Sequence, residues 1–434
     1  MPLAPTVSLE TIETYLTDLI PRVLPAPNPR GRPEILPGTL LWTALLVGIA
    51  RGGITQLELW RQLSQTGLWE HPRIPVSAEA VRQRLVRHGP AVVQTLFTRV
   101  TAELLATVPA DETLAPFATG VYALDESTLD QVARTLPHLR PVPPGDDRLL
   151  PGKVAAAFDL RRQLFTTIQT IDAPRQNERV AARAVLATVP PGSLILADLG
   201  YFGFEWFDDL TDGGYHFVSK LRKHTSVEPV HTLTRTAHVT DELVWLGAHR
   251  SDQAKHLVRR IAVRLGGVQQ VYLTNVREPD RLPVAEVVRL YARRWDIELA
   301  FKTLKCELGL GLLWSAKREL IALQLWGALL IAQIASALRA EVAQRAGIDL
   351  FDVSLALLLR ELPAVARREG SNTLAYLATL PRVKGGYLRP ARRTPRTVPG
   401  ELPVSTPPPT LVTLRTPRYA GRKCGPNRTD RRPR

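Results

Sequence analysis

A helical alternation of polar and apolar positions is clear at residues 291–305, YARRWDIELAFKTLK. At about 100° of rotation per residue, four polar side chains fall into one narrow row. The row consists of Tyr291, Arg294, Glu298 and Lys305, and Lys302 falls beside it. The residues between them are apolar, namely Ile297, Leu299, Ala300, Phe301 and Leu304. The pattern predicts one half-buried helix that presents a mixed-charge stripe to a binding partner.

The wider pattern divides the chain into a helical first part and an α/β second part. Residues 1 to about 115 indicate helices, with loops at the Pro- and Gly-rich PAPNPRGRP and near GLWEHPRIP. From about residue 117 the pattern indicates strands in GVYALDEST, SLILADLG and YHFVSKLRK, a hairpin in KVAAAFDLRRQLFTTIQTI and a helix in NERVAARAVLATV. This alternation predicts an α/β core.

Residues 224–275 interrupt that alternation. Their two strand-like stretches, VHTLTRTAHVTDELVWLG and VRRIAVRLGGVQQVYLTNV, have turns at Gly247 and at Gly266 and Gly267. We therefore expect a β-rich insertion ahead of the helix at 291–305.

One helix of the first part has a basic outer face. Ser77 is a typical N-cap and Gly89 a typical stop for the segment between them. The inner face carries Val81, Leu85 and Val86, and the outer face carries Arg82, Arg84 and Arg87. The face suits a helix laid on DNA phosphates or in a groove. A solvated basic surface fits it equally well.

The stretch Leu320–Leu338, LIALQLWGALLIAQIASAL, is nearly long enough to cross a bilayer. Gln324 and Gln333 interrupt it, and charged residues flank it closely on both sides. We interpret it as a helix buried in a large core, with a membrane span as the alternative.

Charge favours a polyanionic partner and is concentrated in the tail. The 434 residues carry a net charge of +15 and a pI near 10.2, which favours nucleic acid. The tail from Arg382 holds 14 Lys or Arg against two Asp or Glu, so 12 of the 15 net charges lie there. Pro-rich and without a periodic apolar face, it is expected to be largely disordered and to bind phosphates without sequence preference.

The two cysteines exclude some classes of protein. Cys306 and Cys424 are too few and too distant for a disulfide framework or a Cys-based zinc site, and a reducing cytoplasm fits. The N-terminal MPLAPTVSLETIETYL lacks the basic start and apolar centre of a signal peptide.

Two predicted strands end in an aspartate, Asp125 in ALDEST and Asp198 in LADLGYFG. Functional groups of α/β sheets gather at the carboxyl ends of strands. With Glu298, three carboxylates would repel one another unless a cation such as Mg²⁺ neutralised them. Singly, each acid has a plainer interpretation: the aspartates as turn residues and Glu298 as part of a helical ion pair. Glu126 is a rival to Asp125.

Four further acids are interpreted as surface or cap residues. They are Asp130, Glu205, Asp208 and Asp209.

Together these motifs resemble a known family. The spacing of Tyr291, Arg294, Glu298 and Lys305 is that of the YREK signature of the cut-and-paste DDE transposases of bacterial insertion sequences, the group conventionally numbered four. LDEST is similar to the first-Asp motif of that group and ADLGYFG to the second. The acids lie 73 and 100 residues apart, and the longer interval leaves room for the insertion that this group places before its catalytic Glu. The resemblance covers roughly residues 75–340.

The resemblance implies a fold and a division into domains. The fold would be α/β, an RNase H-like catalytic core with a β-rich insertion, preceded by a helical N-terminal DNA-binding domain. We expect the DNA-binding domain at 1–115, the catalytic domain at 116–345 with its insertion near 224–275, a helical region at 346–385 and the basic tail at 386–434. Relatives often carry an Arg after the second Asp, where this chain has Leu199.

The resemblance also implies roles for residues. Asp125 would bridge two Mg²⁺ ions, Asp198 and Glu298 would each complete one, and Mn²⁺ could substitute. Tyr291, Arg294 and Lys305 would hold the phosphates of cleaved double-stranded DNA. The family further implies hydrolysis at an element end, hairpin formation, reopening and strand transfer to target DNA. A homodimer on paired ends, in the bacterial cytoplasm with the nucleoid and without a membrane, would carry them out.

Two other functions remain open. One is a catalytically inactive or domesticated DNA-binding repressor, and the other is a metal-dependent nuclease of the same fold without strand transfer. In this group an aromatic residue of the insertion can stack a flipped base. Trp245 and Tyr272 are candidates, although an aromatic residue on a strand is more often core.

Overall fold

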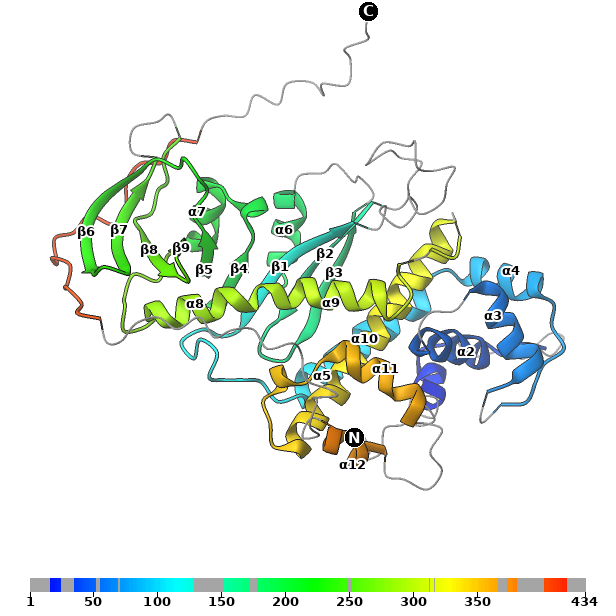
Figure 1. Cartoon of the computed structure of the whole chain (residues 1–434). Helices are drawn as coiled ribbons and strands as arrows, with labels where there is room; N and C mark the ends of the chain where they lie inside the picture. Colours follow the sequence, from blue (N-terminus) through cyan, green and yellow to red (C-terminus); the bar gives the residue numbers. More distant parts are fainter. Residues whose placement is uncertain are drawn as a thin grey trace, which may run out of the picture. The chain divides into compact units, whose positions relative to one another are not determined.

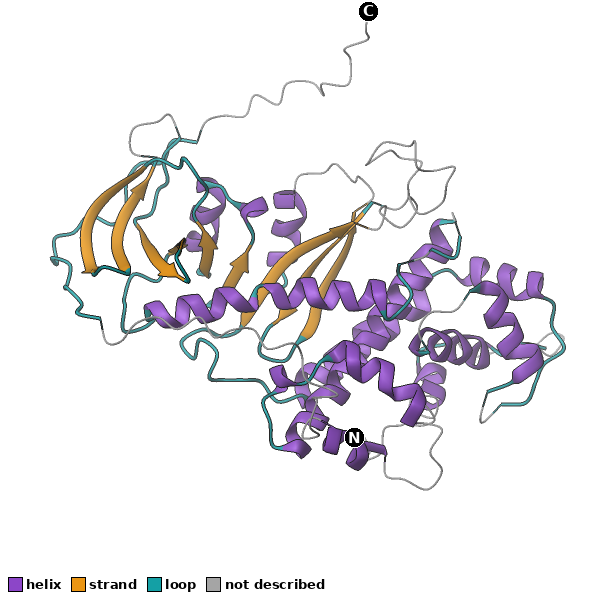
Figure 2. Ribbon diagram, in the orientation of Figure 1, coloured by secondary structure: helices purple, strands orange, loops and turns teal. Residues whose placement is uncertain are grey.

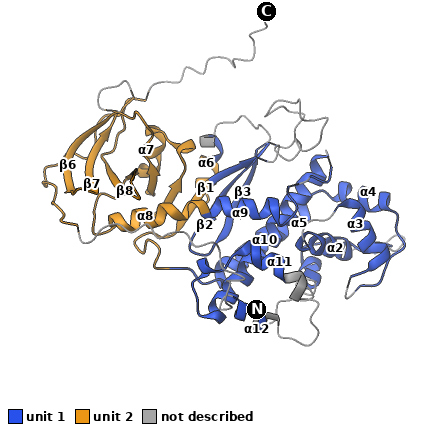
Figure 3. Cartoon of the chain, viewed as in Figure 1, with its two compact units in different colours: residues 1–111, 125–181, 296–394 blue, residues 112–124, 182–295, 395–434 orange. Residues whose placement is uncertain are grey.

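The structure is a computed structural model, and the chain folds into two compact units (Figure 3). Unit 1 comprises residues 1–111, 125–181 and 296–394, and unit 2 comprises residues 112–124, 182–295 and 395–434. The structure describes residues 16–24, 35–51, 55–68, 71–128, 152–171, 178–247, 252–311, 313–315, 317–365, 373–380 and 402–419. Asp130 and Cys424 lie outside these ranges.

Unit 1 is mostly helical, and unit 2 is built on a sheet (Figures 1 and 2). Elements wholly in unit 1 are η1 (Ile20–Arg22), α2 (Gly38–Ala50), α3 (Gln56–Arg61), η2 (Gln62–Thr66), α4 (Ala78–His88), α5 (Ala91–Thr107), β2 (Lys153–Asp159), β3 (Leu164–Ile171), α10 (Arg318–Ala346), η6 (Leu350–Asp352), α11 (Leu355–Val365) and α12 (Thr373–Thr379). Elements wholly in unit 2 are β4 (Leu194–Ala197), η5 (Leu199–Tyr201), α7 (Phe204–Asp212), β5 (His216–Lys220), β6 (Val227–Arg235), β7 (Val239–Leu246), β8 (Val258–Leu265), β9 (Val268–Thr274) and α8 (Val284–Arg293). Three elements belong to both units: β1 (Val121–Thr128), α6 (Glu178–Leu186) and α9 (Trp295–Cys306).

The core of unit 1 is α10, which packs against α5, α2, α11 and α12. Its apolar side chains are buried on nearly every side, and Trp326 meets Phe97 of α5 with ring centroids 5.3 Å apart. Gly327 lets α2 approach closely, because a Cβ there would lie 2.4 Å from the Ile49 Cδ1 atom. By length and composition α10 could cross a membrane, but 94% of its most apolar window is buried. The prediction of a buried core helix is confirmed.

Two of the three glutamines of α10, Gln324 and Gln333, are buried and hydrogen-bonded. The Gln333 amide donates to Thr101 Oγ1 (2.8 Å) and to the Phe165 carbonyl (2.7 Å), and it accepts from the Phe165 N–H (3.0 Å). It therefore pairs the main-chain groups of β3 that face away from β2. Gln324 accepts from the Trp314 N–H and donates to the Gly309 carbonyl, which fixes the turn after α9.

In unit 1 the strand order is β3-β2-β1, and β2 and β3 form the predicted hairpin. Asp159, buried at its turn, accepts from the N–H groups of Arg161 and Arg162 and from the Arg162 guanidinium. Burial raises the pKa of Asp159, and the Arg162 bonds oppose the shift. The hairpin is confirmed with its turn where expected.

In unit 2 the strand order is β1-β4-β5-β9-β8-β7-β6. The β1–β4 and β4–β5 pairs are parallel, and every later pair is antiparallel. The strands expected near 224–275 are confirmed, as is the turn at Gly266 and Gly267, both with φ above +50°. The sequence did not indicate that β9 would pair with β5, which joins the β-rich segment to the parallel strands.

A buried ion pair ties these strands to α8. Arg259 of β8 binds Asp241 of β7 through two N–H groups at 2.8 and 2.6 Å, and both side chains are fully buried. Its third nitrogen donates to the Leu282 carbonyl at 2.7 Å, next to the N-cap residue Pro283. The pair therefore fixes the start of the helix that carries Tyr291.

Part of the tail differs from its expectation. Residues 402–419 lie along unit 2 with main-chain bridges at Gln253–Arg418 and His256–Leu414, so this stretch has fixed partners. Disorder was predicted because the residues that bind this stretch are distant in the sequence, and the tail itself gives no sign of them. Residues 381–401 and 420–434 lie outside the described residues.

Replacing Gln333 tests its role in the core. Gln333→Met keeps the volume but leaves a buried N–H and a buried carbonyl of Phe165 without partners. We expect a loss of about 1–3 kcal/mol in the free energy of unfolding of unit 1. Urea denaturation followed by tryptophan fluorescence measures it. Gln344→Met, at an exposed site of α10, is the matched control, and equal effects would contradict the role.

Candidate active site

Two aspartates follow a pair of residues in register. Leu124 of β1 pairs with Ala197 of β4 in a parallel ladder. Asp125 is the next residue of β1, which continues to Thr128, so the prediction that this strand ends at Asp125 was wrong. Asp198 directly follows the last residue of β4, and both aspartates are half-buried. Neighbouring strands are about 4.8 Å apart, so the two backbones lie side by side at the residues just before the aspartates.

On β1, neighbouring acids point to opposite faces. The Glu126 carboxylate pairs with Lys153 of β2 at 3.3 Å. Asp125 shares the other face with Ser127, because side chains alternate along a strand. Ser127 lines a small space together with Phe301 and Lys305 of α9. Asp125 therefore lies on the face that α9 covers, and its rival Glu126 is engaged elsewhere.

The predicted single helix at 291–305 is two helices. α8 ends at Arg293, α9 begins at Trp295, and Arg294 lies between them. Tyr291 and Arg294 are buried at 4% and 3% exposure. Among the other row residues, Glu298 and Lys305 are half-buried and Lys302 is exposed.

One of the apolar positions between the row residues was predicted wrongly. Leu299, expected to pack, is 49% exposed. The helical period gives angles around the axis but not the width of the face that a neighbour covers.

The other acids near Glu298 have partners. Asp296, buried at the start of α9, accepts from the Gln163 amide at 3.1 Å. Glu307 pairs with Arg360 of α11 at 2.8 Å. Glu298 lies seven residues before Lys305, about 10 Å along the helix axis.

In unit 2, Tyr291 lies in a polar and aromatic cluster. Its ring meets Tyr272 of β9 at 5.3 Å, Lys220 of β5 lies 5.6 Å from its centroid and the Arg294 guanidinium lies 5.8 Å from it. Burial raises the pKa of Tyr291, and the negative charge of Asp198 raises it further, while Arg294 opposes the shift. Asp198, Tyr291 and Arg294 therefore share one electrostatic environment.

Two cations at this edge were missed by the sequence analysis. Arg222, just after β5, donates to the Leu199 carbonyl at 3.0 Å, and its guanidinium lies 5.2 Å from the Phe202 ring. Lys220 ends β5, which pairs directly with the strand of Asp198. Arg222 thus places a positive charge beside Leu199, the position at which this chain lacks the arginine that relatives often carry. A sequence signal was available, because Lys220 and Arg222 stand at the end of a predicted strand. The aspartates were selected by the same kind of position.

The described residues contain no group of three or more His, Cys, Asp or Glu side chains close enough together to hold a metal ion. Asp125 and Glu298 lie in unit 1, and Asp198 lies in unit 2. Asp125 lies on the face of β1 that α9 covers, and Glu298 is a residue of α9.

The basic helix forms as expected. In α4, Ser77 caps the start by accepting from the Ala80 N–H, and Val81 and Leu85 are buried. Arg87 is exposed. Arg82 donates to Glu79 at 2.7 Å through its Nε atom, so part of its positive charge is neutralised within the helix.

The two candidates for base stacking in the β-rich segment, Tyr272 and Trp245, both pack against other groups of the protein. Tyr272 is 1% exposed, which fits a core residue. The ring of Trp245 is covered by Arg415 of the tail, with the guanidinium 4.6 Å from the centroid.

Comparisons with known proteins find transposases. Residues 127–334 match the family described as Transposase DDE domain, a match that starts two residues after Asp125. The transposase for insertion sequence element IS231F of Bacillus thuringiensis subsp. israelensis is 24% identical over 257 residues, covering 47% of this chain and 54% of that protein. Transposase InsG for insertion sequence element IS4 of Escherichia coli (strain K12) is 26% identical over 189 residues, covering 41% and 42%. The chain spans about half the length of these relatives.

A piggyBac transposase synaptic complex with hairpin DNA is similar at a TM-score of 0.42 and 10% identity, covering 89% of this chain and 80% of that one.

The environment of Tyr291 predicts its behaviour in alkali. Because its pKa is raised in the folded chain, the phenol stays neutral at about pH 10, where an ordinary tyrosine ionises. The native state keeps this contribution below the unfolded pKa and loses it as pH rises further. Tyr291→Phe should therefore leave the ultraviolet absorbance titration near pH 10 unchanged. A titrating phenol missing from the variant would contradict the assignment.

Proposed function

We propose that this chain, whose residues 127–334 form a transposase DDE domain and place it among insertion-sequence DDE transposases, cuts and joins DNA by cut-and-paste transposition. The substrate would be double-stranded DNA: the ends of the element and a target. The observation that carries the proposal is the parallel register of Leu124 with Ala197, residues that Asp125 and Asp198 directly follow.

The catalytic acids are proposed to be Asp125, Asp198 and Glu298. Glu298 is favoured over Asp296 and Glu307 because it alone has the signature spacing to Tyr291, Arg294 and Lys305. An RNase H-like core is supported by the β2–β3 hairpin beside β1 in unit 1 and the parallel β1-β4-β5 order in unit 2.

The three carboxylates fit Mg²⁺, and Mn²⁺ as a substitute, by their donor atoms. All are oxygen ligands, and Asp198, although it occupies an N-cap position, makes no side-chain capping bond. When bound, a pair of such ions lowers the pKa of an attacking hydroxyl and stabilises the leaving oxygen.

The basic groups around the acids would hold phosphates. Arg294 and Lys220 flank Tyr291, and Arg222 lies beside the turn after Asp198. Lys305 and Lys302 belong to the same helix as Glu298. Tyr291, neutral through its raised pKa, would add a hydrogen-bond donor. Together they position an end so that its phosphorus lies in line with the nucleophile.

The proposed sequence consists of phosphoryl transfers. Water cleaves a strand at the element end and leaves a 3′-hydroxyl. This oxygen attacks the opposite strand, so that a new phosphodiester forms as the old P–O bond breaks and a hairpin closes the end. Water reopens the hairpin, and the 3′-hydroxyl finally attacks a target phosphodiester. Each joining step exchanges one phosphodiester for another.

The remaining parts are proposed to bind and assemble DNA. The N-terminal helices at 1–115 would contact it through Arg82, Arg84 and Arg87 of α4, and 116–345 would carry the chemistry. Residues 346–385 would support the core, and the basic tail at 386–434 would add contacts to phosphates. A homodimer on paired ends, in the bacterial cytoplasm with the nucleoid, is the proposed working form.

A joining assay separates this function from its alternatives. Purified protein is incubated with pre-cleaved element ends and plasmid DNA. Joined products support transposition, whereas cutting alone would support a nuclease and binding alone a repressor.

Glu298→Gln should abolish end cleavage while the melting temperature and end binding stay near wild type. The change keeps the volume and helix propensity but removes the charged ligand. Glu307→Gln, one residue past the end of α9, is the matched control; it loses only the ion pair with the exposed Arg360 and should cleave normally. Cleavage by Glu298→Gln would refute the assignment. Asp125→Asn and Asp198→Asn should behave as Glu298→Gln.

Metal removal gives an independent test. EDTA should stop cleavage and leave end binding intact. Added Mg²⁺ or Mn²⁺ should restore cleavage. Undiminished cleavage in the chelator would rule out a metal-dependent reaction. In the same assay Lys305→Ala should respond to Mg²⁺ as wild type does but form fewer hairpins and joined products.

A further inference from the structure

Two hairpin turns lie side by side at one end of the β-rich segment of unit 2. One turn joins β6 to β7, and the other joins β8 to β9. The Arg264 N–H donates to the His238 carbonyl at 2.9 Å, which links the two turns. We call residues 235–238 and 264–269 together the hairpin tip.

The hairpin tip extends past the edge of the sheet at which Asp198 lies. β9 runs antiparallel to β5, and Tyr272 of β9 pairs with Lys220, the last residue of β5. The four residues of β9 before Tyr272 therefore continue beyond β5 by about 13 Å, at about 3.3 Å for each residue. Because β4 and β5 are parallel, this is also the direction in which β4 leads into Asp198.

The hairpin tip is basic and contains no acid. Residues 235–240 and 260–271 include three arginines and one histidine but no Asp or Glu. Asp241 and Glu242, which follow directly on β7, are only 1% and 2% exposed. The exposed charge of this end of the sheet is therefore positive and attracts anions.

The three arginines lie on one face of the sheet. Thr240 of β7 pairs with Arg235 of β6 and with Ala262 of β8, so these three side chains share a face. Because side chains alternate along a strand, Arg260 and Arg264 lie on the same face as Ala262. The sheet register thus gathers all three guanidinium groups.

A buried carboxylate positions two of these arginines and leaves the third unpaired. Glu242 pairs with Arg235 at 3.3 Å and with Arg260 at 3.2 Å. The Arg235 side chain is still 69% exposed, so it can bind a second anion. Arg264 is exposed as well, and it has no acidic partner in the part of the chain that the structure describes. One carboxylate against three guanidinium groups leaves a surplus of positive charge.

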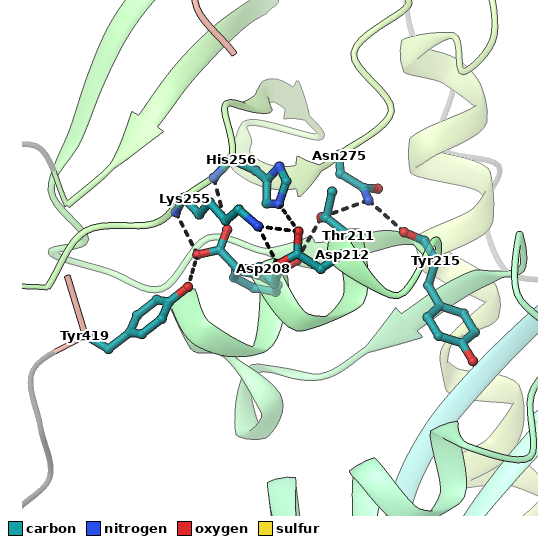
Figure 4. Close-up of polar contacts among 9 residues, drawn as sticks. Asp208, Thr211, Asp212, Tyr215, Lys255, His256, Asn275 and Tyr419 are labelled. Carbon is teal, nitrogen blue, oxygen red and sulfur yellow. Dashed lines mark hydrogen bonds and ion pairs between the residues drawn. The ribbon is translucent and has the colours of Figure 1, made fainter. Parts of the chain in front are cut away.

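At the opposite end of these strands, cations are bound by the protein itself (Figure 4). Asp208 of α7 accepts from the N–H groups of Lys255 and His256, at 2.7 and 3.0 Å. It also accepts from the Tyr419 hydroxyl at 2.8 Å. The Lys255 ammonium donates to Asp212 at 2.7 Å, and the His256 ring lies 2.8 Å from the same carboxylate. Asp208 is 2% exposed, so its interpretation as a surface or cap residue was wrong.

Arg415 of the tail is bound at that end too. Its Nε atom donates to the Ala254 carbonyl at 2.8 Å, and its guanidinium lies over the ring of Trp245. These contacts use its donors for the protein. The two ends of the sheet therefore differ, because the hairpin tip presents Arg235 and Arg264 to solvent.

We propose that the hairpin tip binds the phosphates of a DNA duplex that extends beyond the edge at Asp198. Arg235 and Arg264 each contact a phosphate, to which a guanidinium can donate two hydrogen bonds. Glu242 holds Arg235 in place for this contact. Phosphate contacts carry no base recognition, so the binding is independent of sequence. The proposal rests on the proposed function, because it takes DNA to be the substrate that reaches Asp198.

Each phosphate contact has a measurable effect on affinity. It contributes about 0.9 to the slope of log K against log salt concentration, so its loss near 0.1 M salt weakens binding on the order of tenfold. The two arginines together should account for a slope of about 1.8.

DNA binding by the full chain tests the hairpin tip. The variants are Arg264→Ala alone and Arg264→Ala combined with Arg235→Ala. Fluorescence anisotropy measures the Kd for a short labelled duplex of arbitrary sequence at several salt concentrations. The Kd should rise on the order of tenfold for the single variant and 100-fold for the double variant, whose slope should be shallower by about 1.8. An unchanged Kd and slope in the double variant would overturn the proposal.

Arg418→Glu is the matched control at the opposite end of the sheet. It changes the net charge by the same two units as the double variant, at an exposed side chain whose residue bonds to Gln253 through the main chain. Since salt screens charges over about 10 Å near 0.1 M, this variant should raise the Kd by less than about threefold. Equal losses in the control and the double variant would show a general effect of net charge and overturn the proposal.

A melting curve and a second duplex complete the test. Arg264→Ala removes only an exposed, unpaired side chain and should melt as wild type, so it decides the outcome even where the double variant is unstable. The loss of affinity should be the same for an element-end duplex as for the arbitrary one. A loss confined to the element end would mean that the hairpin tip reads bases, and the assignment to phosphates would be wrong.

Failure of the hairpin tip and failure of the proposed function give different results. If the variants lose affinity but the wild type never joins element ends, only the proposed function is refuted. If the wild type joins ends and the variants bind DNA as it does, only the role of the hairpin tip is refuted.

Discussion

The parallel pairing of β1 with β4 is the constraint on which the candidate site depends. A ladder that aligns Leu124 with Ala197 must also deliver the residues that follow them, whatever their chemistry. A shift of one residue in either strand would turn an aspartate to the opposite face. The apolar residues before each acid, buried on both faces, hold this register. At this edge, the packing that holds the two strands in register therefore also fixes where the two aspartates lie.

Local features of this arrangement could be predicted from the sequence. The strand end at Asp198, the turn at Asp159 and the glycine turn between β8 and β9 were recognised from alternation and turn residues, which act over a few positions, whereas the predicted end of β1 at Asp125 was wrong because the strand continues to Thr128. The polar row was recognised too. Its interruption at Arg294 was not, because a one-residue break between helices leaves the spacing of the side chains almost unchanged.

Long-range partners could not be predicted. Nothing next to Asp208 announces that a tyrosine more than 200 positions later will reach it, and Gln333 in an apolar helix gives no sign of its bonds to Phe165. Both are buried polar groups, for which the cost of lost hydration makes a partner necessary without naming it. The position of α9 over the face of β1 that carries Asp125 belongs to the same class.

The way the chain alternates between its units has a consequence for truncated forms. Each unit is assembled from three separate stretches of sequence, and three of the passages fall inside regular elements: between Leu124 and Asp125 in β1, between Ala181 and Ala182 in α6, and between Trp295 and Asp296 in α9. No single nick or premature stop can therefore release either unit whole. A fragment ending before α9 would leave the first stretches of unit 1 without α10, the helix around which they pack. Partial copies of this chain should be removed by proteases rather than persist as competing DNA binders.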